Sequence, residues 1–317
     1  MTSVVRGLSL FCLTFLVSCS NPILQDFSGE IYGTTYSVKI AENSSYAHLE
    51  SKIKNELTRV DYVFSTYKPS SEISLINNGD SLEWSDEFRN LYEISQKIST
   101  LSGGAFSPKN DNGYDFSAIG KGYAIDKIAE LVEQNGANNY FIEIGGEIRS
   151  KGAKFKGNWI FGIERPINSK KSPYIAFNIP REGISIATSG EYREPNHIWG
   201  DGPRDLLSVT VAHESATYAD AWATALYVLG KDQGLKTAES NGLAVFFISS
   251  SGDSTQSSNW SMISPMINAL LAIIVVALSI CGMAIGLIVK NKPLSPSCGG
   301  VYLSKGEACQ VCGKVKD

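Results

Sequence analysis

Apolar side chains recur at three- and four-residue spacing in four stretches of the chain, and this is the period of a helix with one buried face. In the first stretch the pattern runs from Leu49 to Phe64, and in the second it ends before the pair Gly103-Gly104. The four predicted helices cover residues 46–64, 88–101, 119–132 and 218–229.

Shorter runs that are alternately or continuously apolar predict strands. These strands cover residues 32–40, 140–148, 159–163, 174–179, 183–187, 206–211 and 243–248. Helices and strands are mixed without a regular βαβ alternation and without a visible repeat. The predicted class is therefore α+β, with mostly antiparallel sheets.

The longest apolar run lies near the C-terminal end, where no charged residue occurs between Asp253 and Lys290. Residues 266–289 are almost entirely apolar, and a helix of this length crosses the hydrocarbon core of a bilayer. Lys290 and Lys292 follow directly. By the positive-inside rule, residues 290–317 are expected in the cytoplasm and the large domain on the other side of the membrane.

The N-terminal residues 1–19 have the pattern of an export signal, with Arg6 before an apolar stretch. That stretch ends in Leu16-Val17-Ser18-Cys19, which resembles a bacterial lipobox with Cys19 as the lipidated residue. An ordinary signal peptide with an incidental cysteine is the alternative. Both ends predict a bacterial inner-membrane protein with a periplasmic domain at 20–253, joined to the membrane helix by a polar linker at 254–265.

Composition narrows the function classes. The 28 Lys and Arg against 32 Asp and Glu give a formal charge of −4, which provides no polycationic surface, so we expect no nucleic-acid partner. The 43% hydrophobic residues and the 29 glycines exclude a disordered or collagen-like chain. All six cysteines lie outside residues 20–280, so the central domain has neither disulfide nor thiolate chemistry.

Two polar side chains share one face of the last predicted helix of the domain. Asp220 and Thr224 are four residues apart, so their oxygens project about one turn from each other between alanines. A carboxylate and a hydroxyl suit Mg²⁺, which takes few protein ligands and completes its shell with water and phosphate oxygens. The simpler interpretation is that Asp220 lies near a helix N-terminus and that Thr224 bonds to a backbone carbonyl.

Three further segments have the composition of a binding site. In Tyr114–Tyr123, small residues open a helix whose N-terminal amides face an anion, and Lys121 pairs with a phosphate. Turns that follow predicted helices carry Tyr67 and Phe106, whose rings stack on a planar group such as flavin or adenine. A plain helix entry and aromatic caps on the edge of the core are the alternatives.

Taken in order, these segments resemble the ApbE family of FAD:protein FMN transferases over about residues 30–250. The resemblance rests on Gly33-Thr34-Thr35-Tyr36, the Ser-Thr-Tyr and Ser-Glu-Ile-Ser turn at 65–74, Gly-Ala-Phe-x-Pro at 104–108, Ser-Ala-Ile-Gly-Lys-Gly-Tyr at 117–123, Ile-Gly-Gly-Glu-Ile at 144–148, Ala-Thr-Ser-Gly-Glu-Tyr at 187–192, His197-Ile198, and Ala-Asp-Ala-x-Ala-Thr-Ala-Leu at 219–226.

The resemblance implies a flavin cleft between two lobes, with FAD as substrate and Mg²⁺ at its pyrophosphate. The implied metal ligands are the Ala118 carbonyl, the Asp220 carboxylate and the Thr224 hydroxyl. The implied flavin contacts, together with Lys121 from the glycine-rich segment, are Tyr32, Tyr67, Ala105, Phe106, Ser107 and Asp115.

The implied reaction breaks the pyrophosphate of FAD, joins FMN to a Ser or Thr of an acceptor protein and releases AMP. The metal neutralises charge on the leaving group, so we count Asp220 among the catalytic residues. His197 is the expected general base and Asp201 the second choice. Two departures from the family's pattern concern this region: Ser107 stands where aspartate is usual, and the loop at 197–203 is shortened.

The predicted cytoplasmic tail contains Cys298, Cys309 and Cys312. In a reducing compartment these thiolates are expected to bind a metal, Fe or Zn, transiently or in a site shared with a partner. The membrane helix followed by Cys-Gly-Gly and Glu-x-x-Cys-x-x-Cys resembles NqrM, which serves the maturation of the Na⁺-translocating NADH:quinone oxidoreductase. The two resemblances together predict acceptor flavoprotein subunits of that membrane complex, or related Rnf-type subunits, as partners. A zinc-binding tail without this role is the alternative.

Two other functions fit the same residues. A Mg²⁺-dependent FAD pyrophosphatase would use the same metal and flavin sites with water as the acceptor. A membrane assembly factor would bind flavin and iron without catalysis.

Overall fold

The computed structural model describes residues 23–80, 83–166, 173–263 and 275–279. Contacts divide the chain into one unit at 1–264 and a second at 265–317. None of the helices in the described ranges combines the length and the apolarity needed to cross a membrane. The predicted signal peptide at 1–19, the predicted span at 266–289 except 275–279, and the tail at 290–317 lie outside the described residues. The same holds for Cys19, Cys298, Cys309 and Cys312.

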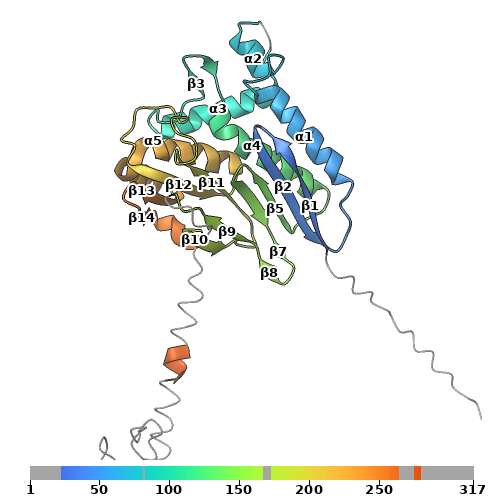
Figure 1. The fold of residues 1–317 in the computed structure, drawn as a ribbon, viewed down its shortest axis with the longest axis vertical. Coiled ribbons are helices and arrows are strands. Elements are labelled where there is room, and N and C mark those ends of the chain that lie inside the picture. Colours follow the sequence, from blue (N-terminus) through green and yellow to red (C-terminus); the bar gives the residue numbers. More distant parts are fainter. Residues whose placement is uncertain (1–22, 81–82, 167–172, 264–274, 280–317) are drawn as a thin grey trace, which may run out of the picture. The chain divides into compact units, whose positions relative to one another are not determined.

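An antiparallel sheet of eight strands forms the centre of the domain (Figure 1). Its order is β1 (Ile23–Ile31), β2 (Thr34–Glu42), β5 (Tyr140–Ile144), β6 (Glu147–Lys151), β11 (Ile184–Ser189), β12 (Leu206–His213), β13 (Ala244–Ser249) and β14 (Ser254–Gln256). Three small hairpins accompany it: β3 (Lys109–Asn110) with β4 (Gly113–Tyr114), β7 (Ala153–Lys154) with β8 (Gly157–Asn158), and β9 (Ile160–Ile163) with β10 (Ile175–Asn178). The expected α+β class with antiparallel pairing is confirmed.

The helices gather on one side of this sheet (Figure 1). They are α1 (Leu49–Phe64), α2 (Glu72–Asn77), α3 (Asp86–Leu101), α4 (Ser117–Gln134) and α5 (Ala216–Ser240). Their apolar faces and the facing side of the sheet form the larger core. A smaller core on the other side packs β9, β10 and the short 3₁₀ helix η1 (Ser258–Met262) against the sheet. Residues 23–263 therefore belong to one unit, and the contacts do not divide them into the two lobes that were expected.

Glycines at turns explain two differences from the predicted elements. The strand predicted over 140–148 is two strands, because Gly145 and Gly146 have φ of +60° and +100° and reverse the chain. The helix predicted to end at Leu229 continues to Ser240 with a break at Gly230, whose φ is +72°. An apolar pattern does not report such breaks, since it continues on both sides of them.

Residues 254–263 of the predicted polar linker are part of the folded domain. Strand β14 pairs with β13, and η1 places the Trp260 side chain, which is fully buried, in the smaller core. The Ser257 hydroxyl donates to the Leu243 carbonyl at 2.6 Å and accepts from the Val245 amide at 2.8 Å. The polar composition of this segment therefore reflects edge pairing rather than a solvated tether.

Candidate functional site

A buried carboxylate joins α4 to α5. The Asp220 side chain is 3% exposed, and its Oδ2 accepts a hydrogen bond of 2.9 Å from the amide of Gly122. A Cβ at Gly122 would lie 2.2 Å from the Ala216 carbonyl oxygen, so only glycine permits this approach of the two helices. In an α-helix, the Gly122 amide stands one turn after the carbonyl of Ala118, the first predicted metal ligand. The contact therefore brings the helical turn that begins at Ala118 against Asp220.

The second predicted ligand on α5, Thr224, faces the end of a strand. Its Oγ1 lies 3.1 Å from the Oγ of Ser189, the last residue of β11. The alternative interpretation was that the Thr224 hydroxyl bonds to a carbonyl of its own helix. In the structure its hydrogen-bond partner is the Ser189 hydroxyl. Asp220 and Thr224 thus project from α5 toward the first turn of α4 and the end of β11.

Glu147 is a site residue that sequence reasoning missed. It opens β6 directly after the Gly145-Gly146 turn, is 4% exposed, and its Oε1 lies 2.6 Å from the Nζ of Lys121. Burial raises the pKa of Glu147 to about 7, and burial also raises the pKa of Asp220. Burial lowers the pKa of Lys121, but the neighbouring carboxylates outweigh it and the net shift is upward. The clue available in the sequence was an acidic residue directly after two glycines.

This buried centre fits a hard divalent cation. Two buried carboxylates stand against a single ammonium, and the Oε2 of Glu147 has no hydrogen-bond partner. A backbone carbonyl, a carboxylate and a hydroxyl are oxygen donors of the kind that Mg²⁺ prefers. Within the described ranges, no three His, Cys, Asp or Glu side chains stand close enough together to hold a metal. A cation here would therefore keep several water or phosphate ligands.

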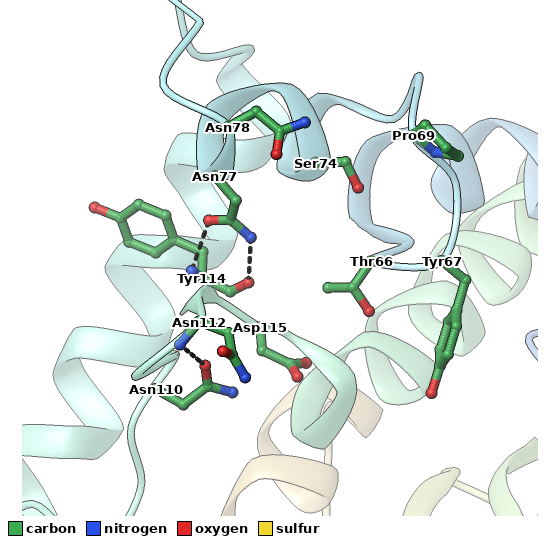
Figure 2. Close-up of a pocket in the computed structure, with 10 residues that line it drawn as sticks. All are labelled: Thr66, Tyr67, Pro69, Ser74, Asn77, Asn78, Asn110, Asn112, Tyr114 and Asp115. Carbon is green, nitrogen blue, oxygen red and sulfur yellow. Dashed lines mark hydrogen bonds between the residues drawn. The ribbon is translucent and has the colours of Figure 1, made fainter.

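A cavity of about 440 Å³ opens beside the start of α4 (Figure 2). Its walls come from the turn after α1, from α2, and from the β3–β4 hairpin. It is lined by Thr66, Tyr67, Pro69, Ser74, Asn77, Asn78, Asn110, Asn112, Tyr114 and Asp115. The side-chain amide of Asn77 joins α2 to the hairpin. Its Nδ2 donates to the Tyr114 carbonyl at 2.8 Å, and its Oδ1 accepts from the Tyr114 backbone amide at 2.7 Å.

Two of the predicted flavin contacts, Tyr67 and Asp115, line this cavity. Tyr67 is 95% exposed, which leaves its ring free for stacking at the mouth. The Asp115 Oδ1 accepts a hydrogen bond of 2.8 Å from the Ser117 amide at the start of α4. Asp115 therefore caps the start of the helix that carries the predicted ligand Ala118.

The remaining predicted flavin contacts do not line the cavity. Phe106 was expected to be exposed on its turn, but its side chain is 2% exposed in the larger core, and its amide donates to the Ser102 hydroxyl. Ala105 is only half-buried beside it. The Ser107 hydroxyl bonds to the backbone of Lys109, and the Tyr32 hydroxyl donates to the Leu57 carbonyl at 2.9 Å.

His197 lies on the exposed loop after β11. Its Nδ1 is 2.6 Å from the Glu194 carbonyl oxygen. Because a carbonyl only accepts, Nδ1 carries the proton in the neutral ring and Nε2 keeps its lone pair. This is the tautomer that a general base requires. Asp201, the second choice, is exposed on the same loop.

Comparisons with known proteins agree with this arrangement. The sequence profile of the ApbE family matches residues 32–112 and 109–247. The FAD:protein FMN transferase of Vibrio cholerae is 29% identical over 316 aligned positions, which cover 77% of this chain and 93% of that protein. The Escherichia coli enzyme of the same name is 28% identical and covers 71% of this chain and 84% of its own length.

The solved structure of the flavin transferase ApbE from Vibrio cholerae superposes with a TM-score of 0.68 at 26% identity. It covers 76% of this chain and 99% of its own. The ApbE protein of Thermotoga maritima has a TM-score of 0.67 at 20% identity and supports the fold alone. With the matched profile spanning well over half of its residues, this chain belongs to the ApbE family.

Proposed function

We propose that this chain transfers FMN from FAD to a Ser or Thr hydroxyl of an acceptor protein. One observation above all supports the proposal: the buried Asp220 carboxylate contacts the Gly122 amide in α4, the helix that begins two residues after Asp115 in the cavity wall. The names of the related proteins supply the reaction.

In this mechanism, the acceptor oxygen attacks the phosphorus of the FMN half, the bond to the AMP phosphate breaks, and AMP leaves with the bridging oxygen. A bound Mg²⁺ supplies neutralisation of the pyrophosphate charge. The Ala118 carbonyl, Asp220 and Thr224 would hold this ion, and Lys121, which pairs with Glu147 beside them, would add a positive charge. The Nε2 of His197 takes the proton of the acceptor hydroxyl.

Incubation of the full-length protein with FAD, Mg²⁺ and an acceptor subunit tests the proposal. We expect flavin fluorescence on the acceptor that survives acid denaturation. Asp220→Asn keeps an oxygen for the Gly122 amide but removes the charge, so transfer should fall by about 100-fold or more. If free FMN and AMP form instead while the acceptor stays unlabelled, the pyrophosphatase reading replaces the transferase.

We further propose that the domain is periplasmic and held at the inner membrane by residues 266–289, with a second anchor at a lipidated Cys19. The uncharged apolar run and the lysines that follow it support this topology. A C-terminal alkaline phosphatase fusion should be inactive, and an active fusion contradicts the topology.

For the tail, we propose that Cys298, Cys309 and Cys312 carry iron to the membrane NADH:quinone reductase whose subunits accept FMN. Their spacing supports a thiolate metal site. Replacing Cys309 and Cys312 with Ser should lower the iron content of the purified complex, and unchanged content removes the assignment.

A further inference from the structure

One arginine, Arg204, bonds the backbone of the loop directly after His197. The Arg204 guanidinium donates to the carbonyl oxygen of Ile198 at 2.8 Å and to that of Gly200 at 3.0 Å. It also pairs with the Glu191 carboxylate at 3.1 Å. The planar fork of a guanidinium is suited to span several oxygens at once.

Glu191 completes this contact, which we name the Glu191–Arg204 latch. Its Oε1 accepts from the amide of Ile198 at 3.2 Å, and its Oε2 also accepts from the Tyr227 hydroxyl at 3.3 Å. Tyr227 lies on α5 with only 4% of its surface exposed, and the Arg204 guanidinium stands 5.9 Å from the centre of its ring. The latch therefore fixes the loop to the helix that carries the predicted metal ligands.

The loop itself has little freedom to adopt another path. Asn196 and Arg204 have φ of 62° and 50°, a region that costs energy for residues other than glycine and persists only where the surroundings enforce it. A Cβ at Gly200 would lie 2.8 Å from a Val228 methyl group, and one at Gly202 would lie 1.9 Å from the Val228 carbonyl. Val228 is one turn of α5 beyond Thr224, so the loop docks next to the buried centre.

An isolated surface ion pair contributes little to folding. The latch differs because it bonds the backbone directly after His197: Arg204 donates to the carbonyls of Ile198 and Gly200, and Glu191 accepts from the amide of Ile198. These bonds fix local backbone geometry rather than overall packing. We propose that Arg204 is a positioning residue that, through Glu191, presents the Nε2 of His197 to the acceptor hydroxyl. This inference rests on the proposed transferase function.

A double-mutant cycle on the full-length protein tests the inference. Arg204→Ala should lower kcat for transfer to the acceptor by about 10- to 100-fold, because small misplacement of a catalytic group is costly, and should leave the KM for FAD within about twofold. In a His197→Ala background, the same change should alter the residual rate by less than about twofold. The inference is overturned if Arg204→Ala lowers the rate by the same factor in both backgrounds, so that the two losses multiply. It is also overturned if the main effect of Arg204→Ala is on the KM for FAD.

Arg193→Ala is the matched control, because Arg193 lies on the same loop, pairs with Glu164 and is 69% exposed. It should leave transfer unchanged. Glu191→Gln is a second variant in case Arg204→Ala fails to fold; it keeps an acceptor for the Ile198 amide and should show the same pattern with a smaller loss.

Hydrogen exchange provides a readout without catalysis. The Ile198 amide of the apo protein should exchange at least about tenfold faster in Arg204→Ala than in the unmodified protein or in Arg193→Ala. Equal exchange in all three contradicts the latch. If the unmodified protein shows no transfer at all while exchange follows the expected order, the latch stands and the proposed function fails.

Discussion

At the scale of single residues, Tyr67 is the side chain whose exposure is hardest to explain by folding alone. It is 95% exposed and lines the cavity, so its ring is free to stack on a ligand bound there.

Tyr67→Ala should therefore weaken FAD binding by about 2- to 12-fold, the value of one aromatic stacking contact of about 0.5–1.5 kcal/mol. The matched control is Tyr62→Ala, since Tyr62 is 53% exposed on α1 and does not line the cavity. Titration of each variant with FAD measures the affinity. Equal losses in both variants contradict stacking at Tyr67.

His213 gives the fold a pH dependence near the start of α5. Its Nδ1 accepts from the Ser215 amide at 3.0 Å, and its ring stacks on Tyr218 at 5.2 Å between centroids. Burial lowers the pKa of His213 below its ordinary value of 6.5. The unfolded chain thus binds more protons below about pH 6.5, and stability is lost as the pH falls through this range.

Urea unfolding of the metal-free protein at about pH 7.5 and about pH 5.5 measures this effect. His213→Asn, whose side-chain oxygen replaces Nδ1 as the acceptor, should lose less stability between the two pH values than the unmodified protein. A loss of the same size in both proteins removes His213 as the cause.

At the scale of elements, regular apolar periodicity predicted helices well and turns poorly. The helix predicted over 46–64 is α1, which ends at Phe64 as expected, and the strand predicted from Leu206 is β12. Strand β1 was missed because none of its residues is fully buried, so it carries no apolar alternation. The edge of a sheet gives a weaker signal than its centre for this reason.

In the candidate site, too, the sequence predicted local relations and missed contacts between distant elements. The i, i+4 spacing of Asp220 and Thr224 is local, so the sequence predicted that they share a helix face. Glu147 and Asn77 were missed, because their neighbours come from elements far away in the sequence. The expected exposure of Phe106 was wrong: the glycine-rich turn indicated an exposed ring, but the ring packs in the larger core with residues far away in the sequence.

The packing of α4 on α5 provides a test at this scale. Gly122→Ala should destabilise the protein by about 1–3 kcal/mol, since its Cβ would meet the Ala216 carbonyl oxygen, and should weaken Mg²⁺ binding. Gly120→Ala is the control on the same helix, where a Cβ would meet nothing within 4 Å, and should stabilise by about 0.5–1 kcal/mol. Chemical denaturation measures both, and a shift of the same sign contradicts the close approach.

At the scale of the whole molecule, the domain is complete only with residues 254–263. Trp260 is fully buried and Ile263 is 4% exposed in the smaller core, which lies on the side of the sheet opposite the helices. Deleting a buried tryptophan side chain alone costs about 3–5 kcal/mol.

A chain that ends after Asp253 should therefore unfold at a much lower temperature than one that ends after Ser264, although both lack the predicted membrane segment. Thermal unfolding of the two shortened chains gives the comparison. Equal midpoints would restore the linker interpretation for this segment.

The central claim, that the buried centre and the cavity together move FMN from FAD to a protein, is tested most directly by stoichiometry. Full-length protein is mixed with FAD, Mg²⁺ and an acceptor subunit, and both AMP and acceptor-bound FMN are counted. The account predicts one AMP for each FMN attached to a Ser or Thr, with both products formed about 100-fold or more slowly by Asp220→Asn. Release of AMP without labelled acceptor, or equal yields from Asp220→Asn, would contradict it.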